Sequence, residues 1–259
     1  MKHFIYLFLF FSSSIFSQEI IGISPIKNID LQTERLVSID NFGTTYFIDK
    51  NVFHKQNTTK TITYNNLQLG DITTAGVFNP LKINLFYKDF NTVVILDNRL
   101  AEIFKIDFNT KQPYRNISFI STGHDNTLWL FNQDTQELEL YDYKSNTTRV
   151  VTLPIQDRIL DMTSNYNYCY LLTENQLLTY NYFGSLIAKT KNEGYTAISE
   201  SNENLFLKKE NSLFYLKKNT KNALPIELPN LLIQRFFVTN ETLYIYDSEI
   251  LHQYQLKIN

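Results

Sequence analysis

The residues best suited to catalysis or metal binding are few and scattered along this chain of 259 residues. The four histidines are His3, His54, His124 and His252, and no two of them stand at the spacing of a metal site. Only His124 has a carboxylate beside it, Asp125, in the turn sequence GHDN. A turn residue that bonds its own backbone is the simpler interpretation of this pair, and a ligand or a base is the alternative.

The single cysteine, Cys169, lies in the apolar run YCYLL, which predicts a buried thiol and leaves no partner for an internal disulfide. The sequence contains no Asp-rich calcium loop, no Gly-rich phosphate cradle and no G-x-S-x-G nucleophile motif. No pair of carboxylates stands out for acid and base work. We therefore expect no metal, no cofactor and no enzymatic activity.

Charged residues recur at matching points of the sequence. A cation stands near the start of each of several expected strands, and an acid stands near the end of the strand that follows. The cations are Arg35, Lys82, Arg115, Arg158 and Arg235, and the acids are Asp49, Asp97, Asp134, Glu174 and Asp247. Ion pairs between neighbouring units, worth about 0–1 kcal/mol each when exposed, are the simpler interpretation. The sharper one is a charged rim around the channel mouth that receives an acidic or zwitterionic partner segment.

The longest expected connection, NLQLGDITTAGVFNPLK at 66–82, carries an apolar tail that includes Phe78. Pro80 restricts the residue before it to extended geometry and so fixes how the chain enters the next strand. We expect this loop to plug the mouth of a channel, and Phe78 is the candidate anchor for a partner if it does not.

Tyrosines alternate along three other segments, at Tyr141 and Tyr143, at Tyr166, Tyr168 and Tyr170, and at Tyr180 and Tyr182. Tyrosine is common in interface hot spots. Alternation along a strand nevertheless favours packing between neighbouring sheets, with the hydroxyl at the edge.

The first 17 residues have the pattern of a secretory signal peptide. A short basic start is followed by the apolar run FIYLFLFF and by SSSIFS, with an expected cut after Ser17. This run is too short to span a bilayer, and no cysteine near the cut could carry a lipid anchor. We expect residues 18–259 to form one exported domain in the periplasm or at the outer membrane.

Composition favours an all-β domain. The chain has 17 Tyr, 20 Phe and only 7 Gly, and aromatic side chains fit the half-buried surface of a sheet. The formal charge of −2 gives no electrostatic footprint for nucleic acid or for an anionic membrane.

Short strands recur with a period close to 40 residues, which is the signature of a β-propeller. The expected innermost strands begin near residues 36, 83, 117, 159, 196 and 233, so that 79–107 supplies the three inner strands of the second unit. The last unit lacks a fourth strand, and the strand expected at 19–31 belongs to no other unit. The sequence therefore predicts six four-stranded blades closed by the N-terminal strand, with five or seven blades as alternatives.

Two hairpins carry a resemblance to a known family. DNTLWL at 125–130 and DNFGTTY at 40–46 resemble the hairpin of two-component-regulator-type propeller repeats, and neither keeps the Ser and Gly of the sialidase Asp-box. Together with the export signal, the Asn- and Tyr-rich blades resemble exported envelope propellers of Bacteroidetes-type bacteria. That resemblance implies a scaffold or accessory subunit of a cell-envelope complex, of the kind that accompanies secretion or gliding machinery.

Two other classes of function remain open from the sequence. One is a small-ligand or glycan binder that uses the channel mouth around Arg35, Lys82, Arg115 and Arg158. The other is a hydrolase or lyase, which would need a cluster of carboxylates or histidines on one face.

Overall fold

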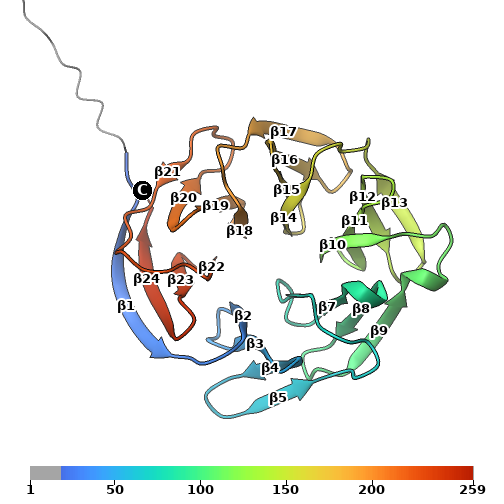
Figure 1. The fold of residues 1–259 in the computed structure, drawn as a ribbon, viewed down its shortest axis with the longest axis horizontal. Helices are drawn as coiled ribbons and strands as arrows, with labels where there is room; N and C mark the ends of the chain where they lie inside the picture. Colours follow the sequence, from blue (N-terminus) through green and yellow to red (C-terminus); the bar gives the residue numbers. More distant parts are fainter. Residues whose placement is uncertain (1–18, 259) are drawn as a thin grey trace, which may run out of the picture.

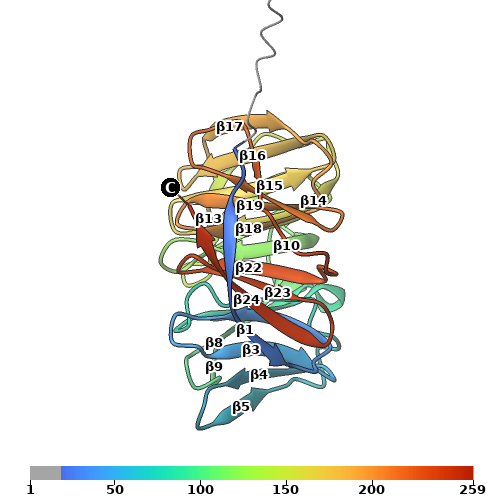
Figure 2. The same ribbon diagram turned by 90° about the vertical axis from the view of Figure 1, so that its left-hand side faces the viewer.

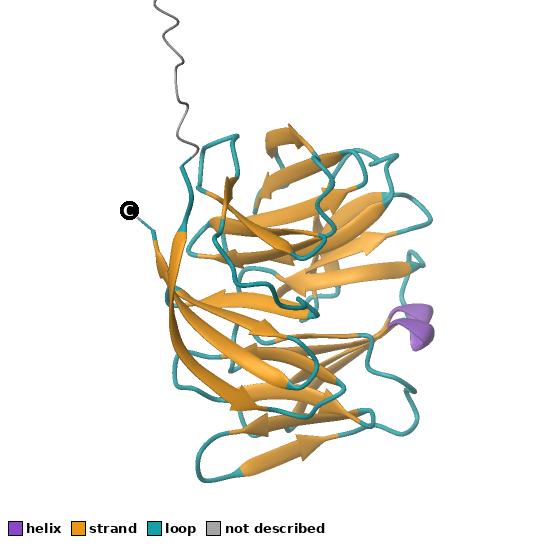
Figure 3. Ribbon diagram, turned by 60° about the vertical axis from the view of Figure 1, so that its left-hand side comes forward, coloured by secondary structure: helices purple, strands orange, loops and turns teal. Residues whose placement is uncertain are grey.

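In the computed structural model, which describes residues 19–258, six small sheets stand around a central axis (Figure 1). Each sheet has four antiparallel strands, and almost everything outside them is loop (Figure 3). The predicted six-bladed all-β propeller is therefore confirmed.

The blades are numbered along the chain, and their strands run outward from the channel. Blade 1 contains β2 (Arg35–Ile39), β3 (Thr45–Asp49), β4 (Val52–Gln56) and β5 (Thr61–Tyr64). Blade 2 contains β6 (Thr74–Gly76), β7 (Ile83–Tyr87), β8 (Thr92–Leu96) and β9 (Glu102–Asp107), with the 3-10 turns η1 (Lys88–Phe90) and η2 (Phe108–Thr110). Blade 3 contains β10 (Ile117–Thr122), β11 (Thr127–Asn132), β12 (Glu137–Asp142) and β13 (Thr147–Val151).

The second half of the ring repeats this order. Blade 4 contains β14 (Ile159–Ser164), β15 (Tyr168–Thr173), β16 (Gln176–Asn181) and β17 (Leu186–Lys191). Blade 5 contains β18 (Ala197–Ser201), β19 (Asn204–Lys209), β20 (Ser212–Leu216) and β21 (Leu224–Pro225). Blade 6 contains β22 (Arg235–Thr239), β23 (Thr242–Tyr246), β24 (Ile250–Lys257) and, outermost, β1 (Gly22–Asp30).

The N-terminal strand closes the ring, as the sequence predicted. β1 pairs antiparallel with β24 from Gly22 opposite Lys257 to Asp30 opposite Ile250, and it crosses the outside of the last blade (Figure 2). The imidazole of His252 on β24 adds a hydrogen bond of 3.1 Å from Nδ1 to Asn28 Oδ1 on β1. This pairing covers an edge that blade 6 would otherwise expose.

Blade 2 corrects one expectation. Its innermost strand is β6 at 74–76, inside the segment that was expected to be a loop, and β7, β8 and β9 are the second, third and fourth strands. The sequence signal misled because β6 is only three residues, TAG, whereas every residue of β7 and β8 is buried. Fully buried strands look like the inside of a sheet even when they lie further out.

The core is divided among the six junctions between blades. Each junction holds its own cluster of buried side chains, for example Tyr46 and Leu85 between blades 1 and 2, and Trp129 and Cys169 between blades 3 and 4. Cys169 is fully buried, as predicted, and burial raises the pKa of its thiol. The blades therefore hold the innermost strands in place around the channel.

Because the strands of each blade alternate in direction, the ring has two distinct faces. We call the face where the innermost strands begin the entry face, and the face where they turn into the second strands the hairpin face.

Candidate functional site: the central channel and its two mouths

The channel is a cavity of about 780 Å³ that all six innermost strands line. It extends along the whole of β2, from Arg35 at the entry face to Phe42 beyond the strand at the hairpin face. Pockets for small molecules fall in the range of about 300–1,000 Å³, so the channel has room for one.

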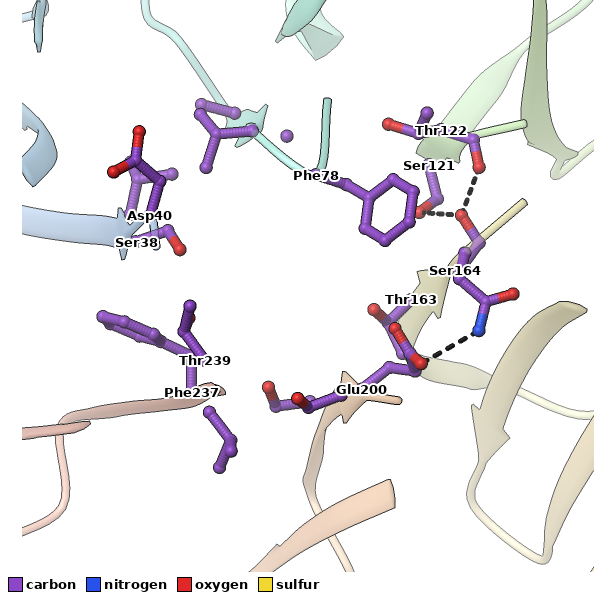
Figure 4. Close-up of a pocket in the computed structure, with 18 of the residues that line it drawn as sticks. Ser38, Asp40, Phe78, Ser121, Thr122, Thr163, Ser164, Glu200, Phe237 and Thr239 are labelled. Carbon is purple, nitrogen blue, oxygen red and sulfur yellow. Dashed lines mark hydrogen bonds between the residues drawn. The ribbon is translucent and has the colours of Figure 1, made fainter. Parts of the chain in front are cut away.

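Hydroxyl and amide groups join the channel wall across three blades. The Ser164 hydroxyl is hydrogen-bonded to Ser121 Oγ at 2.6 Å and to the carbonyl of Thr122 (Figure 4). The side chain of Asn84, buried in blade 2, donates to Thr122 Oγ1 at 3.0 Å. These bonds fix the wall between blades 2 and 4, so this side of the channel is polar and preorganised.

Two carboxylates line the wall in the neighbouring blades 4 and 5. Asp161 Oδ1 accepts from the backbone N–H of Met162, and Oδ2 accepts from that of Ile198 in blade 5, both at 2.9 Å. Burial raises the pKa of Asp161 to about 6, although both hydrogen bonds act in the opposite direction. Glu200 accepts from Asn165 Nδ2 at 2.9 Å, and burial raises its pKa as well. The side chain of Glu200 lies at the cavity in Figure 4.

Of the residues that the sequence singled out for binding, the structure brings Arg35 and Phe78 to the channel and places the other three elsewhere. Lys82 precedes β7, so it lies at the hairpin face, where its ammonium donates to the Asp125 carbonyl at 2.8 Å and to Asn126 Oδ1 at 3.1 Å. The expectation that it shares a rim with Arg35 is wrong, because it was assigned to the wrong strand of blade 2.

Arg115 and Arg158 lie near the entry face but outside the channel wall. Arg115 is buried inside blade 3, where Nε lies 2.7 Å from Glu139 Oε2. Arg158 is exposed and pairs with Glu174 at 3.1 Å. The four predicted cations therefore do not form one ring, and their role in binding a partner remains a prediction.

Five aromatic rings from blades 2, 3 and 4 meet on the hairpin face. Phe78 packs edge to face on Tyr166 with 4.9 Å between ring centroids, and the His124 ring lies 6.0 Å from that of Tyr166 and 6.1 Å from that of Tyr182. Phe183 follows at 3.9 Å from Tyr182. We call these five residues the aromatic patch.

The aromatic patch is exposed to solvent. Phe183 is 67% exposed, and Phe78, Tyr166 and Tyr182 are each 40% exposed or more. The expectation that the tyrosines pack between blades therefore holds for Tyr141, Tyr143, Tyr170 and Tyr180, which are buried, and fails for Tyr166 and Tyr182, which lie in turns. Sequence reasoning missed the patch because its members come from three repeats.

Within residues 19–258, no three or more His, Cys, Asp or Glu side chains come together as a metal site would require. In the same part of the chain, no helix has the length and apolar character needed to cross a membrane. The expected signal peptide at 1–17 lies outside the described residues.

Comparison with known proteins confirms the fold. No protein-family model matches the chain, and no curated protein matches it either. Virginiamycin B lyase from Staphylococcus aureus has a similar structure, with a TM-score of 0.60 and 14% identity over 91% of this chain and 94% of that one. BamB from Moraxella catarrhalis follows at 0.50 and 12% identity, over 84% of this chain and 70% of that one. The WD40 domain of Pan2 from Neurospora crassa reaches 0.58 at 7% identity, over 88% and 76%.

These neighbours correct the prediction that the chain is not an enzyme. The lyase is an enzyme, and a catalytically inactive variant of it was solved with quinupristin. The absence of a recognisable motif in the sequence is therefore no argument against catalysis, because this fold supports it elsewhere. At 12–14% identity the likeness shows the fold alone.

Proposed function

We propose that this protein is an exported interaction subunit of a cell-envelope complex, and that it binds a protein partner through the aromatic patch on its hairpin face. The observation that carries the proposal is the patch itself: five contiguous rings held on turns of a rigid ring. Exposed apolar clusters of this kind mark interaction sites, and Tyr is enriched among the residues that dominate binding energy.

Two further observations support a location in the cell envelope. BamB has a similar structure, and the leader-like residues 1–17 together with the Asn- and Tyr-rich blades resemble exported envelope propellers of Bacteroidetes-type bacteria. Both favour an envelope protein of a secretion- or gliding-associated machine. Rigid turns on a closed ring also suit recognition, because little conformational freedom is lost when a partner binds.

The test is crosslinking in producing cells followed by purification from the envelope fraction. The native protein should carry a specific partner, and Phe183→Ser together with Tyr182→Ser should weaken its capture by about 30-fold, the effect of losing one strong hot spot. Leu153→Ser is the matched control, because Leu153 is 86% exposed but follows β13 at the entry face.

Recovery of the native protein only as a free monomer would contradict the proposal. Equal capture by the patch variant and the native protein would show that the partner binds elsewhere.

A further inference from the structure

Three cations of consecutive blades gather at the opposite mouth of the channel. Arg35 is the first residue of β2 and Arg235 is the first residue of β22, so they occupy equivalent positions in the adjacent blades 1 and 6, and both line the cavity. Lys208 belongs to blade 5 and pairs in register with Ala197, the first residue of β18. We call these three residues the cation cluster.

The described contacts of the cation cluster leave its charges without acidic partners. Arg35 Nη1 donates to the Thr73 carbonyl at 2.6 Å and Nη2 donates to that of Ile72. Lys208 Nζ donates to the Ile233 carbonyl at 2.5 Å. The backbone of Arg235 pairs with Tyr246 in the sheet, but its side chain makes no hydrogen bond or ion pair with any residue in 19–258. Neutral carbonyls therefore fix two of the cations and nothing fixes the third.

The charge of Arg235 also repels those of Arg35 and Lys208. Burial lowers the pKa of Arg35 and of Lys208, and the charge of Arg235 lowers both further. Asp71 and Glu34 act in the opposite direction on Arg35, and neither forms an ion pair with it. Asp161 lies in the field of Arg235, but both of its oxygens already accept backbone N–H groups. Arg235 is exposed to solvent, whereas Arg35 and Lys208 are partly buried. A bound negative group would offset both the repulsion by Arg235 and the partial desolvation of the other two cations.

We propose that the cation cluster is a binding site for a small molecule that carries a carboxylate or phosphate group. An arginine presents a planar fork of donors that matches the oxygens of either group, and two arginines with a lysine supply the charge. Arg35 keeps donors free beyond the two already used. The channel behind the cluster has room for the rest of the molecule.

The site differs from the aromatic patch in chemistry and in place. It lies where the innermost strands begin, whereas the patch lies beyond the point where they end. Failure of the anion-site proposal can therefore be distinguished from failure of the proposed function, because Phe183→Ser should leave anion binding unchanged.

The test is isothermal titration of the purified protein with citrate and with inorganic phosphate at low ionic strength, where screening is weak. Glucose is the neutral control, and a hexaglutamate peptide tests a larger anion. We expect saturable binding of citrate or phosphate, and Arg235→Gln should weaken it about tenfold or more, the loss of one charge-assisted hydrogen bond. Comparison of the affinities for citrate and for phosphate decides whether the site prefers a carboxylate or a phosphate group.

The matched control is Arg158→Gln, which removes an exposed arginine near the same face but outside the channel and should leave the affinity unchanged. Arg235→Lys, which keeps the charge and loses the fork, should bind with intermediate affinity and also serves if Arg235→Gln does not fold. The proposal is overturned if neither anion binds saturably, if only the peptide binds, or if Arg235→Gln and Arg158→Gln weaken binding equally.

Discussion

Asp161 links two blades through a carboxylate that the channel keeps poorly hydrated. Its two oxygens accept backbone N–H groups from blades 4 and 5, and burial still raises its pKa to about 6. The protonated form is therefore favoured by folding, in contrast to an ordinary surface carboxylate.

This shift predicts a pH dependence of stability. The pKa in the folded protein lies above the ordinary value of 3.8, so the folded state binds the proton more tightly than the unfolded chain does. The free energy of unfolding should fall as pH rises from about 4 to about 6, by up to about 3 kcal/mol from this group, and should change little above that.

Urea denaturation of the native protein and of Asp161→Asn at several pH values between 4.5 and 7.5 measures this contribution. As pH rises, the free energy of unfolding of the native protein should fall relative to that of Asp161→Asn. Parallel curves for the two proteins would show that Asp161 titrates normally.

Arginines at equivalent positions of the repeat lie in three different environments: at the channel, inside a blade and on the surface. The difference arises because each arginine stands at a different distance in sequence from the first residue of its strand. Arg35 is the first residue of its strand, whereas Arg158 and Arg115 stand one and two residues ahead of theirs. Alternation of side chains applies only within a strand, so the sequence pattern could place the cations near one face but not orient them. Arg235, which the pattern also contained, could not be separated from the others for the same reason.

The connection between β1 and β2 is held by one tyrosine of blade 6. Tyr246 is fully buried, and its hydroxyl lies 3.0 Å from the carbonyls of Leu31 and Thr33, 2.8 Å from that of Ser248 and 3.2 Å from the N–H of Thr33. The hydroxyl donates to one carbonyl at a time and can accept from the N–H of Thr33. It therefore ties the closing strand to the first blade.

We expect Tyr246→Phe to destabilise the protein by about 1–2 kcal/mol, because buried backbone groups lose their partner. Thermal unfolding should show this as a decrease in Tm of about 2–8 °C. Tyr87→Phe is the matched control: Tyr87 is equally buried, but its hydroxyl makes no hydrogen bond with any described residue, so its removal should be neutral or stabilising. Equal losses for the two variants would show that the hydroxyl of Tyr246 plays no special part.

The sequence was sufficient to predict the elements but not to identify each one. Turn residues and the 40-residue period predicted six blades and the closing role of 19–31, because both depend on local chemistry that each repeat carries. The order within blade 2 was wrong because TAG at 74–76 has no aromatic or long apolar residue to mark it. The aromatic patch was beyond reach, because its members come from three repeats. The sequence pattern contained Arg35 and Arg235 of the cation cluster, but it could not separate them from the other cations and did not include Lys208.

At the scale of the whole molecule, stability is distributed around a circle. Six clusters of buried side chains, one at each junction, connect each blade to its two neighbours, and β1 makes the last connection. An open row of repeats contacts only nearest neighbours and can unfold from its ends, whereas a closed ring has no free end.

Because the ring is closed, we expect the native protein to unfold in a single cooperative transition. Deleting the closing strand should split that transition into two. Trp129, the only tryptophan, is buried in blade 3, far around the ring from β1, so its fluorescence reports one side while far-ultraviolet circular dichroism reports all blades. The two signals should coincide during urea unfolding of the native protein. In a variant lacking residues 19–31, circular dichroism should change at lower urea than Trp129 fluorescence, because blade 6 loses its outer strand. Coincident signals in that variant would contradict a role of β1 in cooperativity.

The pairing of Gly22 with Lys257 also determines how the ring responds to mechanical force. Antiparallel partners bring the first residue of β1 and the last residue of β24 to within one strand spacing of each other, about 5 Å. Tension applied between these two points loads the ladder one residue pair at a time, as in opening a zipper, and does not load all of its hydrogen bonds together, as in shear. Tension applied between Gly22 and Lys257 would therefore open this propeller under a weaker load than the same ladder would bear in shear.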